Sequence, residues 1–156
     1  AFKLSTGFYV MVQAFAIPGA VLINFFIDKV DRVMALAISM FIAACGYLYL
    51  GFIDDIFSKQ MYFGAALLGL GEIFANISAI SLIGSAAPAK GRGAVIGGFS
   101  FFGAIGILLV ASIGGYLFDN VGPTAPFTMV GFANVALLTL ALLLLFLERR
   151  KKNQID

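Results

Sequence analysis

Glu72 is the one charged residue in a long apolar stretch of this sequence. From position 61 to 87 the chain reads MYFGAALLGLGEIFANISAISLIGSAA, with no other Asp, Glu, Lys or Arg. An acidic side chain at the centre of a bilayer costs about 2.5–3.5 kcal/mol on insertion scales, so such residues face a protein interior or a watery cavity. Glu72 is therefore a candidate for binding a proton, a cation or a polar group of a substrate. The alternative is a neutral, protonated Glu72 that is hydrogen-bonded to another helix.

Two neighbours in the sequence share the helical face of Glu72. Gly69 precedes it by three residues and Asn76 follows it by four. Positions with these spacings lie on the same side of an α-helix. We therefore expect Asn76 to join Glu72 in any binding site on that face.

The composition is that of a membrane protein. Of the 156 residues, 62% are hydrophobic and 12% are charged, and the mean hydropathy is +1.04. Soluble domains are about 45–50% apolar and about 25% charged. The sequence therefore predicts a chain that is embedded in a lipid bilayer.

The residues that the sequence lacks exclude several kinds of site. It has no His and a single Cys, Cys45, so His-based triads, the usual zinc sites and an internal disulfide are excluded. It has no Walker motif, so this chain supplies no ATP-driven step. The only basic run, at 149–152, follows an apolar stretch and is no nucleic-acid signature. We expect no metal, no cofactor and no nucleic-acid partner.

Five apolar stretches are long enough to cross a bilayer as helices, because a core of about 30 Å needs about 20 residues. They are too long for strands, and they lack the alternation of a transmembrane barrel. The predicted fold class is an all-α, polytopic membrane helical bundle in one transmembrane domain, 1–156, with a basic tail at 148–156. The predicted spans are 7–27, 33–53, 61–87, 93–118 and 126–147.

The basic residues predict the orientation of the bundle. Cytoplasmic loops carry an excess of Lys and Arg, and a cytoplasmic carboxyl terminus leaves only Lys3 and Lys59 outside. The inner side then holds Lys29, Arg32, Lys90, Arg92, Arg149, Arg150, Lys151 and Lys152. Five spans place Ala1 outside, and an outer amino end without a signal peptide normally follows an earlier helix. We therefore expect this chain to be part of a longer protein.

The span at 93–118 is rich in small residues. Gly93 and Gly97 form a GxxxG pair, and Ser100 and Ala104 form a second small pair. Such pairs let helix backbones approach closely in lipid. We expect close packing at most of these glycines, with bending points between conformations as the alternative.

The loop after the first span resembles a known motif. Residues 24–32, Asn-Phe-Phe-Ile-Asp-Lys-Val-Asp-Arg, are similar to the loop motif Gly-x-x-x-Asp-Arg-x-Gly-Arg-Arg of the major facilitator superfamily. Asp28, Lys29 and Arg32 fall on its charged positions, while Asn24 and Asp31 stand where the family prefers glycine. The segments 88–97 and 114–127 resemble the connections of helix ten to eleven and of eleven to twelve.

The resemblance implies a fold and a function. The five spans would be helices eight to twelve of a twelve-helix carrier, that is, a partial carboxyl-terminal half. The implied function is secondary transport of a small solute by alternating access, with protons as a possible coupling ion. The implied partners are the bilayer, the solute and the amino-terminal half of the carrier. The implied location is the plasma (inner) membrane.

The resemblance also implies roles for individual residues. Asp28, Lys29 and Arg32 would belong to a charge network that holds the outward-open state and breaks on inward opening; the alternative is solvated charges that only set topology. Gln13, in the first span, and Ser100 would approach the substrate cavity. For Gln13, an interhelical hydrogen bond is an equally good interpretation.

Two other functions are alternatives to transport. A non-transporting assembly protein, or a degenerate transporter fragment, would explain why half of the cavity is absent. A membrane-embedded enzyme is disfavoured by the missing His, by the single Cys45 and by an intramembrane acid without a partner carboxylate.

Overall fold

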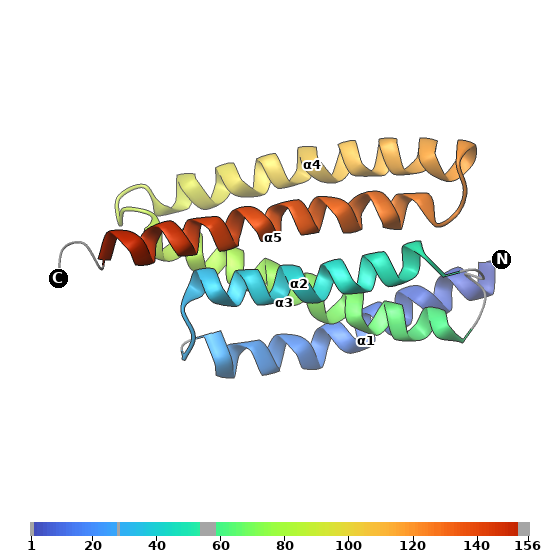
Figure 1. Ribbon diagram of the computed structural model, residues 1–156, viewed down its shortest axis with the longest axis horizontal. Coiled ribbons are helices and arrows are strands. Elements are labelled where there is room, and N and C mark those ends of the chain that lie inside the picture. The colour runs from blue at the N-terminus through green and yellow to red at the C-terminus, as the bar shows by residue number, and fades with distance from the viewer. Residues whose placement is uncertain (1, 28, 54–58, 153–156) are drawn as a thin grey trace.

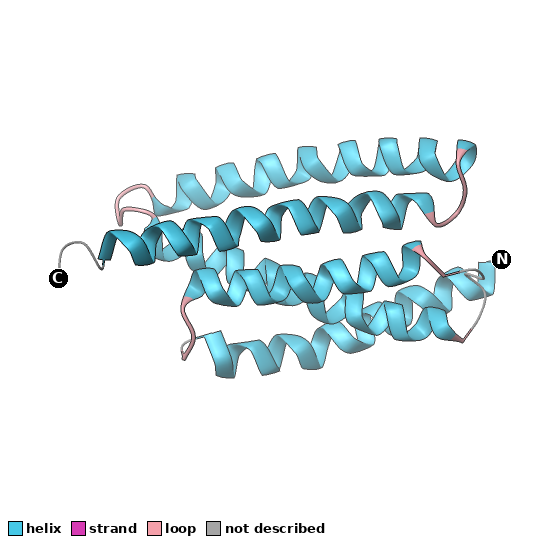
Figure 2. Cartoon of the chain, in the orientation of Figure 1, coloured by secondary structure: helices cyan, strands magenta, loops and turns pink. Residues whose placement is uncertain are grey.

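Five long helices make up the regular structure of the described residues. The computed structural model describes residues 2–27, 29–53 and 59–152. The helices are α1 (Phe2–Ile27), α2 (Arg32–Gly51), α3 (Gln60–Ala86), α4 (Arg92–Asn120) and α5 (Ala125–Lys152). In Figure 2 every described segment is helix, loop or turn. The all-α class predicted from the sequence is confirmed.

Four of the described helices have the length and composition of membrane spans. Among the described residues, α2, α3, α4 and the Ala125–Leu147 part of α5 are long and apolar enough to cross a bilayer. In α1 the apolar stretch Val10–Ile23 is shorter, but the helix has 26 residues and so extends about 39 Å. Each stretch predicted to cross the membrane coincides with one helix.

The α2 helix is the centre of the bundle, since it packs against both α3 and α5, while α1 packs against α3. Figure 1 shows α4 at one edge of the bundle and α1 at the opposite edge. The helices run alternately along the long axis, so the start of α1 and the end of α5 lie at opposite ends of the bundle (Figure 1). This arrangement leaves α3 with α1 on one side and α2 on the other.

Glycines bring α2 and α3 into backbone contact. A Cβ on Gly71 would lie 2.5 Å from the amide nitrogen of Ala43, and one on Gly46 would lie 2.9 Å from that of Leu68. Real Cβ atoms do not approach other atoms so closely, so only glycine fits at either position. In lipid, where the apolar effect no longer drives helices together, such small residues permit the tight packing that holds helices side by side.

The prediction of close packing at the α4 glycines is wrong for the described part of the chain. A Cβ on Gly93, Gly97, Gly103 or Gly106 would meet no described atom within 4 Å. The reason is the position of α4, which contacts α5 and only marginally α3. Gly114 is the exception, because it is buried and its Cβ would lie 3.6 Å from Pro126 of α5.

A side-chain cap fixes the start of α2. The carboxylate of Asp31 accepts hydrogen bonds from the amides of Val33 at 2.9 Å and Met34 at 3.2 Å. These amides have no partner within the helix, and an Asp at the N-cap satisfies them. Asp31, a departure from the family motif, thus has a structural role.

Candidate functional site

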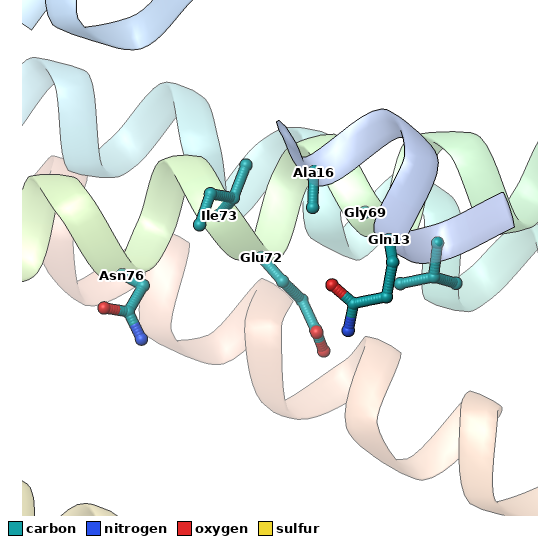
Figure 3. A pocket seen from close by; sticks show the side chains of 7 residues that line it. Gln13, Ala16, Gly69, Glu72, Ile73 and Asn76 are labelled. Atoms are coloured by element: carbon teal, nitrogen blue, oxygen red, sulfur yellow. The ribbon is translucent and has the colours of Figure 1, made fainter. Parts of the chain in front are cut away.

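A small pocket opens beside Glu72 between α1 and α3. Its volume is about 190 Å³. Figure 3 shows the carboxamide of Gln13 and the carboxylate of Glu72 pointing toward the same space, with Asn76 one turn further along α3. The described residues that line it are Val12, Gln13, Ala16, Gly69, Glu72, Ile73 and Asn76. Three of the candidate binding residues, Gln13, Glu72 and Asn76, therefore line the same pocket.

Gly69 allows α1 and α3 to approach closely at the pocket. A Cβ at Gly69 would overlap the carbonyl oxygen of Val12 and would lie 3.1 Å from the carbonyl carbon. A second glycine, Gly19, repeats the pattern further along α1, where an added Cβ would lie 2.8 Å from Leu70 Cδ2. Because Gln13 directly follows Val12, this close approach of α1 brings Gln13 to the pocket that Glu72 lines.

Tyr47 is a partner of Glu72 that the sequence did not reveal. Its hydroxyl, on α2, donates a hydrogen bond to Oε1 of Glu72. Glu72 is thus hydrogen-bonded to another helix, as the alternative interpretation expected, and also lines a pocket. A signal was present in the sequence, because a tyrosine within an apolar helix generally finds a hydrogen-bond partner for its hydroxyl.

The lining defines what the pocket can bind. Its polar groups are one carboxylate and the carboxamides of Gln13 and Asn76, and Glu72 is its only ionisable group among the described lining residues. Carboxamides both donate and accept hydrogen bonds, whereas an ionised carboxylate only accepts. The arrangement suits a proton, a cation or a group rich in hydrogen-bond donors. Within the described residues, no group of three or more His, Cys, Asp or Glu gathers to hold a metal ion.

Ser100 is not one of the residues that line the pocket. It lies on α4, where it is exposed. The α4 helix packs mainly against α5 and contacts α3 only weakly, so it lies away from the pocket between α1 and α3. The structure therefore does not bring Ser100 to Glu72.

The residues of the predicted charge network lie at the junction of α1 and α2. Asp28 lies outside the described residues. Lys29 is exposed in the turn, and Arg32 is exposed at the first position of α2. The residues described between the two helices form a turn and not a helix. Lys29 and Arg32 therefore do not lie on one continuous helix. Neither Lys29 nor Arg32 is among the residues that line the Glu72 pocket.

Comparisons with known proteins give the family. Residues 3–156 match the family described as Major Facilitator Superfamily. Over 125 residues the chain is 35% identical to magnetosome protein MamH of Paramagnetospirillum magneticum, covering 80% of this chain and 29% of MamH. It is 31% identical over 106 residues to magnetosome protein MamZ of the same organism, covering 68% of this chain and 16% of MamZ.

A second MamZ, from Magnetospirillum gryphiswaldense, is 30% identical over 106 residues, again with 68% of this chain and 16% of the relative covered. The chain therefore spans less than a third of the length of each of these relatives. No solved structure matches the chain significantly.

Proposed function

Because this chain belongs to the major facilitator superfamily of membrane transporters, we propose that it forms part of a secondary carrier whose solute or coupling ion binds at Glu72. The observation that carries the proposal is the pocket in which Glu72, Gln13 and Asn76 meet. In carriers of this type, two bundles rock around a site near the bilayer midplane. The family consists of transporters and not of enzymes, which removes the enzyme alternative.

The chain supplies one wall of the substrate cavity in this proposal. A volume of about 190 Å³ is below the range of roughly 300–1,000 Å³ that is usual for small-molecule sites. The relatives are several times longer than this chain, so the facing wall belongs to a further part of the carrier. Gln13 and Asn76 orient the ligand, and Glu72 provides the charge.

A carboxyl group at this place offers a way to couple transport to a gradient. A carboxyl group can hold a proton, and in its ionised form it can bind a cation or accept hydrogen bonds. Glu72 would take up a proton when the cavity opens to one side and release it when the cavity opens to the other. The solute and the proton, or another cation, would then compete for the same carboxylate.

The motif residues Asp28, Lys29 and Arg32 are proposed as the charge network that holds one of the two states. The support is the match to the family motif and the exposure of Lys29 and Arg32 at the end of α1 and start of α2. Asp28→Asn should shift the balance of inward and outward states. Unchanged accessibility of cysteines introduced into the cavity would contradict this role.

We propose a cytoplasmic carboxyl terminus on the basis of the distribution of Lys and Arg, and a location in the plasma (inner) membrane on the basis of the family resemblance. The names of the relatives give a second candidate, the magnetosome membrane. Membrane fractionation with a tagged protein separates the two locations.

A thermal-shift screen of candidate solutes on the whole protein tests the proposed function. A solute at 100 times its Kd adds about 2.7 kcal/mol of stability. The expected result is at least one solute that stabilises the wild type and not Glu72→Gln. A solute that stabilises both proteins equally would contradict binding at Glu72, and a carrier without any such solute would favour the non-transporting alternative.

A further inference from the structure

Glu72 is hydrogen-bonded to α2 and also lines the pocket. Oε1 accepts the hydrogen bond from the Tyr47 hydroxyl on α2. The pocket borders the same side chain and is lined otherwise by α1 and α3. The carboxylate therefore bridges two parts of the bundle, with α2 attached to one oxygen and the pocket next to the side chain.

The Tyr47 ring is held by its own packing. It lies against the buried cluster of Leu50, Met61 and Leu68, where α2 and α3 meet. Gly46, the preceding residue, makes the backbone contact with Leu68 that fixes α2 against α3. This packing holds the Tyr47 ring, and with it the hydroxyl, in one position relative to Glu72. Without that hydrogen bond, the Glu72 side chain would sample several rotamers.

We propose that Tyr47 is a positioning residue for Glu72. Its hydroxyl occupies Oε1, fixes the rotamer of the carboxylate and leaves the second oxygen for the ligand or the coupling ion in the pocket. This inference rests on the proposed function, because it assigns the geometry of the same carboxylate.

The hydrophobic carbodiimide dicyclohexylcarbodiimide is a probe for this role that needs no knowledge of the solute. It reacts with carboxyl groups, and a carboxyl group that is held by a hydrogen bond reacts more slowly than a free one because that bond must first break. Peptide mass spectrometry measures the product at each position. Applied to the whole protein in proteoliposomes, the carbodiimide should label Glu72 at least about tenfold faster in Tyr47→Phe than in the wild type. That factor corresponds to the lower end of what a hydrogen bond to a charged group contributes.

Two controls separate positioning from a general loss of structure. Tyr49→Phe also removes one hydroxyl from α2, but the Tyr49 ring contacts Phe63 at a centroid distance of 5.4 Å and no part of the pocket. This variant should label at the wild-type rate. The exposed carboxylate of Asp119 near the end of α4 serves as an internal reference, and its labelling should be equal in all variants.

Equal labelling of Glu72 in Tyr47→Phe and the wild type, including none in both, would overturn the positioning role. Faster labelling of Asp119 as well would overturn it too, because it would indicate a loosened fold. Neither outcome touches the proposed function, which fails only if solute binding does not depend on Glu72.

Discussion

Replacing Gly69 by alanine should push α1 away from α3 and open the Glu72 pocket. The added Cβ would overlap the carbonyl oxygen of Val12, and it would lie 3.1 Å from the carbonyl carbon and 3.3 Å from Cα of that residue. Carbon atoms in ordinary contact are about 3.5–4.0 Å apart. The neighbour is helix backbone and cannot swing aside, so α1 itself must move by roughly half an ångström or more. Gln13 moves with it, away from Glu72.

The energetic cost follows from the same geometry. Overpacking by one methyl group typically destabilises a protein by about 1–3 kcal/mol. Alanine is also a better helix former than glycine by up to about 1 kcal/mol, and this gain would partly conceal the clash. Gly84→Ala on the same helix corrects for the gain, because its Cβ would meet no described atom within 4 Å.

The measurement is thermal unfolding of both variants in detergent, with solute binding as a second readout. Gly69→Ala should be less stable than Gly84→Ala by about 1–3 kcal/mol, or about 2–4 °C in Tm for each kcal/mol. It should also bind solute more weakly. Equal stability of the two variants would refute the close contact between α1 and α3, and with it the reason why Gln13 reaches the pocket.

Two further predictions concern α2, one its N-terminal cap and the other its link to α5. Asp31→Ala should cost about 1 kcal/mol of stability in thermal unfolding, since the amides of Val33 and Met34 lose their cap. Asp31→Asn should keep most of that stability, because asparagine also caps helices well. An equal loss of stability in both variants would exclude capping. Thr128→Val should cost about 0.5–1.5 kcal/mol, because the Thr128 hydroxyl shares its proton between the carbonyl of Gly51 on α2 at 3.3 Å and that of Thr124 at 3.2 Å. A wild-type Tm would contradict a hydrogen-bonded link between α5 and α2.

The helices could be predicted because their signal is local. Apolar runs of about 20 residues, separated by charged or Pro-Gly segments, suffice to place a span, and each predicted stretch coincides with a helix of the structure. The face shared by Gly69, Glu72 and Asn76 was predictable for the same reason, because it depends only on the helical repeat. All three residues line one pocket.

Contacts between helices could not be predicted in this way. Glycine-rich sequence pointed to α4 as the tightly packed helix, yet backbone contacts occur at Gly46, Gly69 and Gly71 on α2 and α3. Small residues permit a close approach but do not specify which helix approaches. Tyr47 was missed for the same reason, since its bond to Glu72 joins residues 25 positions apart on different helices.

The most direct test of the central claim is gradient-driven uptake by Glu72→Gln in proteoliposomes that contain the whole protein and a solute found in the screen. Glutamine keeps the size of the side chain and can accept the Tyr47 hydrogen bond, but it cannot bind or release a proton. Accumulation against a gradient should be abolished, while exchange of solute across the membrane at equal concentrations should persist. Accumulation at the wild-type level would contradict the claim that Glu72 couples transport.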